Sequence, residues 1–256
     1  MSPLPPVAPA GSAPSTRPAA PARPASPAPG FPLTAWLTHA YTACGAVLAF
    51  LSLNAVASGR VREAFFWLAV AIVVDSSDGV LARTFHVRDR LPDVDGAHLD
   101  DIVDYLTFVL VPTFLLYHTG RLPAGWGLVV AFAVLVVSAI AFSKSDAKTP
   151  DHFFTGFPSY WNIVAFYLYT LDAPAAANGA VLIVLCLLVF VRTGWVYPSR
   201  MPTLRTVTVT FGCAWGALLV YILWQLAAVN RPLLVVSLAF PLYYIVLSLV
   251  LHARRK

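Results

Sequence analysis

The sequence predicts an all-α bundle of membrane-spanning helices, and three features of the chain support this fold class. Of its 256 residues, 59% are hydrophobic and only 11% are charged, with a mean hydropathy of +0.74. A water-soluble domain cannot bury that much apolar surface. The apolar residues form long runs of the length that crosses a bilayer. The Lys and Arg residues fall between these runs and not on one basic face, so we expect no nucleic-acid partner.

The first 30 residues differ in composition from the rest of the chain. They are rich in Pro, Ala and Ser and contain few large apolar side chains. Such a segment cannot bury a hydrophobic core. We therefore predict a disordered tail over residues 1–30 and one membrane-embedded domain over residues 31–256.

Eight apolar segments follow the tail, and we interpret each as a membrane-spanning helix. The predicted spans are residues 38–57, 62–83, 97–119, 124–143, 157–171, 176–194, 205–228 and 232–252. The fifth span is the shortest. The stretch FPLTAWLT, just before the first span, carries Trp36 and is typical of a short helix at the membrane interface.

The 17 Lys and Arg residues are distributed unevenly between the two sides of this predicted bundle. The two tails and the loops after the second, fourth and sixth spans hold 13 of them, and the other loops hold four. Positive charge is retained on the cytoplasmic side of membrane proteins. We therefore expect both termini, and the loop after the second span, on the cytoplasmic side.

Acidic residues are concentrated where the second span ends and the third begins. Eight of the 12 Asp and Glu residues lie between positions 75 and 104. Asp75 and Asp78 are three residues apart, and Asp100 and Asp104 are four apart, so each pair shares one face of a helix. If the two spans form an antiparallel hairpin, both pairs reach the same depth in the membrane.

Four carboxylates at one place would repel one another and would resist ionisation. A divalent cation between them removes this repulsion, and oxygen ligands favour a hard ion such as Mg²⁺ or Mn²⁺. Four carboxylates could hold two ions, which suits phosphoryl transfer. The other acids of the stretch are interpreted as solvated charges: Asp89, Asp93, Asp95 and Asp101.

Small residues accompany the acids. Gly79 and Ala82 remove side-chain bulk from the helix face beside the first acidic pair, and Gly96 does so at the entry to the third span. A flat ligand such as a nucleotide could lie there. Arg83 is placed to meet a phosphate group.

The order of these residues, D-x2-D-G-x2-A-R from Asp75 and G-x3-D-x3-D from Gly96, resembles the signature of the CDP-alcohol phosphatidyltransferases. The likeness covers roughly residues 33–252. One feature departs from the common pattern, because twelve residues separate Arg83 from Gly96. Within the family, this insert and the stretches LTHAYTACGAVLAFL and HFFTGFPSYWN resemble the bacterial members that form phosphatidylcholine.

The resemblance implies a reaction. The phosphatidyl group of CDP-diacylglycerol would pass to the hydroxyl of choline, and CMP would leave. The enzyme would lie in the bacterial inner membrane, with its active site on the cytoplasmic side. Family members often form dimers, so the resemblance also raises a homodimer as an expectation.

The resemblance also implies roles for the signature residues. The expected metal ligands are Asp75, Asp78, Asp100 and Asp104. Asp100 and Asp104 are the expected catalytic residues, and Asp104 is the candidate general base for the alcohol. Room for the cytidine nucleotide would come from Gly79, Ala82 and Gly96, while Arg83 would orient its phosphates.

Choline is a quaternary ammonium ion, and proteins commonly bind such ions with aromatic faces. The candidates near the predicted cytoplasmic side are Tyr105, Phe153, Phe154, Phe157, Tyr160, Trp161, Trp195 and Tyr197. Aromatic residues also gather at membrane interfaces for reasons unrelated to a ligand. The sequence therefore leaves open which of them contact choline.

Two alternatives remain at the level of the sequence. A related transferase could use serine, inositol or glycerol phosphate as acceptor, because the acids serve the CDP-lipid half that all these reactions share. A cation transporter could instead use the aspartates as an ion site, but it predicts acids near the bilayer midplane and an internal repeat. The acids lie at one interface, which favours the transferase. The twelve-residue insert either shapes the acceptor pocket or is an idle loop.

Overall fold

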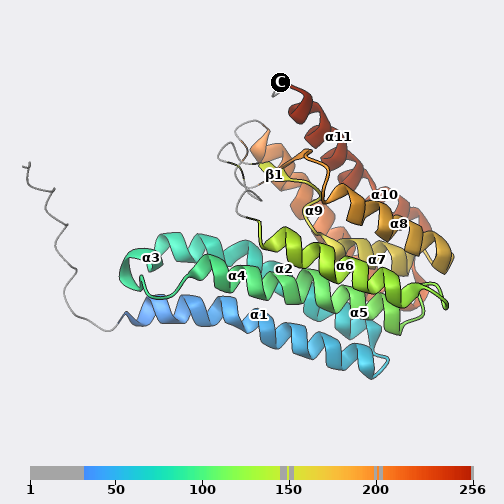
Figure 1. Ribbon diagram of the computed structural model, residues 1–256, viewed down its shortest axis with the longest axis horizontal. Coiled ribbons are helices and arrows are strands. Elements are labelled where there is room, and N and C mark those ends of the chain that lie inside the picture. The colour runs from blue at the N-terminus through green and yellow to red at the C-terminus, as the bar shows by residue number, and fades with distance from the viewer. Residues whose placement is uncertain (1–31, 145–148, 150–152, 199–200, 202–203, 255–256) are drawn as a thin grey trace, which may run out of the picture. The chain divides into compact units, whose positions relative to one another are not determined.

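The computed structural model describes residues 32–144, 149, 153–198, 201 and 204–254. Within these residues the chain is mostly helical (Figure 1). The predicted tail of residues 1–30 lies outside the described residues. The all-α fold class is therefore supported for the described part of the chain.

Three long helical segments pack together in the first half of the domain (Figure 1). They are α1 (Leu33–Ala57), α2 (Val61–Thr84) and a composite of α4 (Gly96–Asp104), η1 (Tyr105–Leu110) and α5 (Val111–His118). α1 packs along α2 and also contacts α4. Gly45 allows this second contact, because a Cβ atom there would lie 2.3 Å from Cγ1 of Val103.

The composite helix contains a π-helical turn, η1, directly after the residues that carry the second acidic pair. Pro112 follows it at the start of α5. Proline has no N–H to donate, and its ring clashes with the carbonyl group four residues earlier in a regular α-helix. A wider turn with hydrogen bonds to the fifth residue relieves this conflict without ending the helix.

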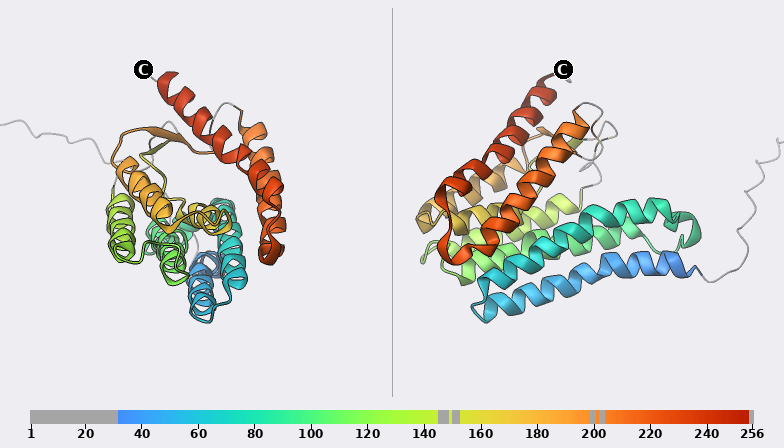
Figure 2. Two further views of the ribbon diagram at one scale, coloured as in Figure 1. Left: turned by 90° about the vertical axis from the view of Figure 1, so that its right-hand side faces the viewer. Right: turned by 180° about the vertical axis from the view of Figure 1, so that it is seen from behind.

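The second half of the domain contains the remaining elements. They are α6 (Gly127–Phe142), β1 (Phe153–Thr155), α7 (Trp161–Thr170), α8 (Ala175–Leu188), β2 (Gly194–Val196), α9 (Arg205–Trp224), η2 (Leu226–Ala228), α10 (Arg231–Ser237) and α11 (Ala239–Arg254). α9 and α11 lie side by side, away from α1 (Figure 2). Two buried apolar clusters hold the halves together, one around Leu115 and Phe166 and one around Val109 and Trp161.

The spans predicted from the sequence each contain a helix, but the helices differ in length. Four are long and apolar enough to cross a membrane: Leu33–Ala57, Val61–Thr84, Arg205–Trp224 and Arg231–Arg254. Two shorter apolar helices are Gly127–Phe142 and Ala175–Leu188. Large apolar side chains are exposed on these elements, as on Trp224 (79% exposed), which suits faces that meet lipid. The chain is thus an integral membrane protein, and the count of eight spans stays a prediction.

The structure differs from the sequence prediction at the start of two spans. α1 begins at Leu33 and continues without a break, so the separate interfacial helix predicted before residue 38 is wrong. The fifth span was predicted from residue 157, but α7 begins at Trp161. Pro158 explains this second difference, because proline disfavours the helical conformation of the residue before it.

A short antiparallel sheet of β1 and β2 is the only strand pairing among the described residues. α11 holds β2 in place by side-chain hydrogen bonds. Ser248 Oγ accepts from the Val196 N–H at 3.2 Å, and the Tyr244 hydroxyl donates to the Val196 carbonyl at 2.9 Å. The sheet therefore connects the loops before α7 and after α8 to the last helix.

Replacing Gly156 by alanine is expected to destabilise this sheet. Gly156 follows β1 with a φ of +82°, and an added Cβ atom would lie 2.3 Å from the carbonyl oxygen of Val189. A non-glycine residue held in such a conformation costs about 1–3 kcal/mol, and the clash with backbone adds to this. Thermal unfolding in detergent should show a lower midpoint for Gly156→Ala.

Gly125→Ala is the matched control for this prediction. Gly125 also lies in a loop, but nothing lies within 4 Å of its added Cβ atom. Its unfolding midpoint should stay close to that of the unchanged protein. Equal midpoints for the two variants would contradict the strain assigned to Gly156.

Candidate functional site

The structure brings three of the four predicted carboxylates into one group. Asp75 and Asp78 lie in the second half of α2, and Asp100 lies in α4. One ligand atom from each residue lies within 4.8 Å of the other two. A hydrogen bond of 2.8 Å between the hydroxyl groups of Tyr41 and Ser77 joins α1 to α2 beside these acids.

The position of α4 depends on its N-terminal cap. The Asp95 carboxylate accepts hydrogen bonds from the backbone N–H groups of Ala97 at 3.0 Å and His98 at 3.2 Å. Asp95 was interpreted as a solvated charge, and its role as a cap was missed. An Asp directly before a helix is a recognised capping signal, so the sequence did contain the information.

The donor set fits a hard divalent cation. Three carboxylates offer only oxygen atoms, which Mg²⁺ and Mn²⁺ prefer. Asp78 is buried at 7% exposure, and a buried carboxylate among others is favourable only with compensating positive charge. The group Asp75, Asp78 and Asp100 could therefore hold a metal ion. Asp104, the fourth predicted ligand, is not part of this group of atoms.

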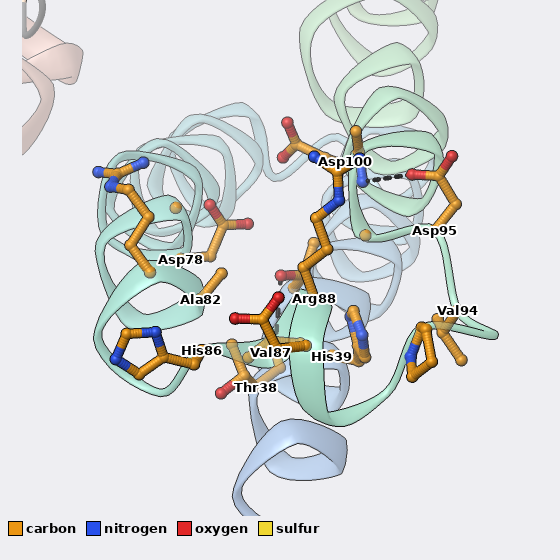
Figure 3. A pocket seen from close by; sticks show the side chains of 17 residues that line it. Thr38, His39, Asp78, Ala82, His86, Val87, Arg88, Val94, Asp95 and Asp100 are labelled. Atoms are coloured by element: carbon orange, nitrogen blue, oxygen red, sulfur yellow. Dashed lines mark hydrogen bonds between the residues drawn. The ribbon is translucent and has the colours of Figure 1, made fainter. Parts of the chain in front are cut away.

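A first cavity of about 840 Å³ opens on one side of the carboxylates (Figure 3). Its lining includes six of the eight signature residues, namely Asp78, Gly79, Ala82, Arg83, Gly96 and Asp100. Gly96 keeps the cavity open toward α1, because an added Cβ atom would lie 3.0 Å from Cε1 of His39. The cavity is large enough for a nucleotide.

The rest of the first cavity comes from two places that the signature does not include. α1 contributes Thr38, His39 and Thr42. The twelve-residue insert contributes His86, Val87, Arg88, Asp89, Pro92, Val94 and Asp95. The sequence did not indicate this use of the insert, because its packing on α1 depends on contacts between distant residues.

A second cavity of about 460 Å³ is also lined by acids of this stretch. Asp75, Asp100 and Asp104 contribute to its lining. Six aromatic side chains also line it: Phe108, Phe142, Phe154, Phe157, Tyr160 and Tyr197. The rings of Phe154 and Tyr197 lie close together, with centroids 4.9 Å apart.

Four of the eight predicted aromatic candidates line this cavity: Phe154, Phe157, Tyr160 and Tyr197. The other four are not among its lining residues: Tyr105, Phe153, Trp161 and Trp195. Two of these four side chains form hydrogen bonds elsewhere in the protein. The Tyr105 hydroxyl donates to the Leu135 carbonyl, and the Trp161 side-chain N–H donates to Ser138 Oγ.

Sequence reasoning missed two aromatic residues of this lining, Phe108 and Phe142. Phe108 follows Asp104 by four residues, so helical spacing could have indicated it. Phe142 comes from the end of α6, and its place in the cavity depends on how α6 packs against η1. No local pattern carries that information.

The two cavities meet at α4. Ala97 and Asp100 line both of them, and the carboxylate group therefore stands between a cavity of nucleotide size and an aromatic cavity. Such an arrangement can hold two ligands next to one cation site. It suits the transfer of a charged group from one ligand to the other.

The chain is similar in sequence to known proteins over most of its length. The family model for CDP-alcohol phosphatidyltransferase matches residues 32–251. The chain is 43% identical over 168 residues to the phosphatidylcholine synthase of Legionella pneumophila, covering 65% of this chain and 66% of that protein. The proteins of the same name from Rhizobium johnstonii and Rhizobium meliloti are 38% and 36% identical, over 74% and 76% of this chain and 78% and 81% of their own lengths.

Proposed function

The chain belongs to the CDP-alcohol phosphatidyltransferase family. From its likeness to the phosphatidylcholine synthases of that family, we propose that it is a phosphatidylcholine synthase. It transfers the phosphatidyl group of CDP-diacylglycerol to choline and releases CMP. The observation that carries the proposal is the carboxylate group between the two cavities, with Asp100 facing both. The CDP end of the lipid occupies the first cavity, and choline occupies the second.

The first cavity binds the nucleotide end of the lipid substrate. Gly79, Ala82 and Gly96 leave room for it, and the guanidinium group of Arg83 donates to phosphate oxygens. Asp75, Asp78 and Asp100 would hold a divalent ion, Mg²⁺ or Mn²⁺. When bound, such an ion offsets the charge of the pyrophosphate and of the departing CMP. A second ion, with Asp104 as a further ligand, is the arrangement that four carboxylates allow.

The second cavity presents the choline hydroxyl to the lipid phosphate. Asp104 lines this cavity and accepts the proton of the hydroxyl as general base. The choline oxygen then forms a bond to the β-phosphorus, and the bond from that phosphorus to the bridging oxygen breaks. CMP leaves with the bonding electrons, so the atoms of the exchange balance.

The aromatic lining favours choline over the alternative acceptors. Serine, inositol and glycerol phosphate carry anionic groups or several hydroxyls that need hydrogen-bond donors. A trimethylammonium group has no such need and is attracted to ring faces. Six aromatic rings and four carboxylates line this cavity beside a single ammonium group, that of Lys144, so the lining as a whole suits a cation. A cation transporter would leave the nucleotide-sized cavity without a use.

We place the protein in the bacterial inner membrane, with both termini and both cavities toward the cytoplasm. The excess of Lys and Arg on that side supports this orientation. Choline and CMP are water-soluble and need an aqueous opening, whereas the lipid must enter from the bilayer. A homodimer remains an expectation from the family.

The test of the proposed function is the release of CMP by the purified protein. CDP-diacylglycerol and Mg²⁺ or Mn²⁺ are supplied with choline, serine, inositol or glycerol 3-phosphate in parallel. Release with choline alone, and formation of phosphatidylcholine in equal amount, is the expected result. Release with another alcohol would support a phosphatidyltransferase but contradict choline as its acceptor. If the folded protein released CMP with none of the four alcohols, the proposed function would be wrong.

Replacing Phe154 by leucine should weaken choline binding without affecting the lipid. Leucine keeps an apolar side chain in the cavity but removes the ring face, which contributes about 0.5–2 kcal/mol to binding of a cation. The KM for choline should therefore rise by roughly 2- to 30-fold. The KM for CDP-diacylglycerol should change little.

Phe153→Leu is the matched control for this variant. Phe153 neighbours Phe154 in β1, and successive side chains of a strand point to opposite faces. Phe153 is not among the residues that line the second cavity. An equal rise in the choline KM for both variants would assign the effect to the strand and not to the ring of Phe154.

A further inference from the structure

The twelve-residue insert between Arg83 and Gly96 is packed against the rest of the domain. Its short helix α3 (Val87–Arg90) contacts both α1 and α2. Val87 is buried, with 3% of its surface exposed. The Arg90 guanidinium donates a hydrogen bond of 3.0 Å to Thr34 Oγ1 of α1. The insert is therefore held in one place on α1 and is not an idle loop.

The way the insert begins decides which side chains face the first cavity. His86 adopts a left-handed conformation with a φ of 49°, which turns the chain out of α2 and into α3. After this turn, Val87 is buried, and Arg88 lines the cavity together with Asp89. Figure 3 shows the Arg88 side chain extending from the insert toward the helix that carries Asp100.

Arg88 thus adds a second guanidinium group to the first cavity. The signature supplies one, Arg83, from α2. Arginine binds phosphate with paired, charge-assisted hydrogen bonds. Carboxylates also line this cavity and repel an anionic ligand. Each positively charged side chain that reaches the cavity offsets this repulsion and favours binding of the anion.

A buried histidine gives independent evidence that the cavity is built for a polar ligand. His39 of α1 lines the cavity and is only 8% exposed. Its Nε2 atom is buried and has no hydrogen-bond partner among the described residues. A buried polar atom without a partner is costly and is normally satisfied by a ligand or water.

We propose that the insert forms a wall of the nucleotide site and that Arg88 binds a phosphate oxygen of the cytidine nucleotide. Arg83 contacts the phosphates from α2, and Arg88 does so from the insert. Arg88 is therefore a substrate-binding residue that the family signature does not include. This inference rests on the proposed function for the identity of the nucleotide.

The experiment compares Arg88→Gln with Arg62→Gln. Both substitutions remove one positive charge. Arg62 is exposed at the start of α2, lines neither cavity and does not belong to the insert. CMP binding to the purified full-length protein is measured by calorimetry with Mg²⁺ present, and cytidine serves as a ligand without phosphate.

Arg88→Gln should weaken CMP binding by about 10- to 100-fold, which is the range for a charge-assisted hydrogen bond. Arg62→Gln should stay within about twofold of the unchanged protein, since it leaves the insert and the charge at position 88 intact. Cytidine should bind both variants and the unchanged protein equally. In turnover, Arg88→Gln should raise the KM for CDP-diacylglycerol and leave the KM for choline unchanged.

Three results would overturn the proposal. They are equal CMP affinity in Arg88→Gln and the unchanged protein, equal weakening in both variants, and equal weakening of CMP and cytidine. The binding measurement does not require turnover. A protein that binds CMP through Arg88 but releases none with choline would contradict the acceptor and leave the role of Arg88 standing.

Discussion

Replacing Asp104 by asparagine is expected to lower the rate of CMP release by about 10²- to 10⁴-fold, the usual contribution of a general base. Asparagine has nearly the same shape as aspartate but cannot accept the choline proton. Asp104 lines the second cavity and lies outside the group of three close carboxylates. The affinity for CMP should therefore remain close to that of the unchanged protein while kcat falls.

The control for this variant is Asp93→Asn. Asp93 lies in the same acidic stretch, is exposed and lines neither cavity. Its kcat should match that of the unchanged enzyme. If a higher Mg²⁺ concentration restored the full activity of Asp104→Asn, Asp104 would act only as a metal ligand and its assignment as the base would be wrong.

Removal of divalent cations is expected to abolish CMP release, and Mg²⁺ or Mn²⁺ should restore it. Asp75, Asp78 and Asp100 offer three close carboxylates for such an ion. Loss of one of these ligands should weaken the site. Asp78→Asn should therefore raise the metal concentration for half-maximal activity by at least about tenfold, since even residues that only support metal ligands contribute this much.

This prediction is checked by titrating the metal back into protein treated with EDTA. Asp93→Asn again serves as the control and should give the same titration curve as the unchanged enzyme. Full activity in EDTA would remove the metal from the mechanism. An unchanged titration curve for Asp78→Asn would remove Asp78 from the metal site.

The acidic half of the site could be predicted from the sequence because its geometry is local. Spacings of three and four residues place side chains on one helix face, and the two helices follow each other in the chain, separated only by the insert. The prediction placed Asp75, Asp78 and Asp100 at one site, and the structure has them there. The separation of Asp104 into the second cavity depends on the path of α4 and was not visible in the spacing.

The acceptor half was predicted less completely because distant segments build it. Phe154 and Tyr197 meet only because β1 pairs with β2, and neither strand was predicted. Each strand has three residues, too few for an alternating pattern to stand out. The insert was uninformative for the same reason, since its packing depends on the bond from Arg90 to Thr34.

The π-helical turn η1 means that the signature residues alone do not fix where the carboxylates point. A π turn holds about one residue more than an α turn, so η1 acts as a single-residue insertion between α4 and α5. Each residue of an α-helix rotates the following side chains by about 100°. Without the extra residue, Asp100 and Asp104 would face a different direction relative to α5. A chain could thus keep every signature residue, lose one residue near Thr107, and no longer have the site.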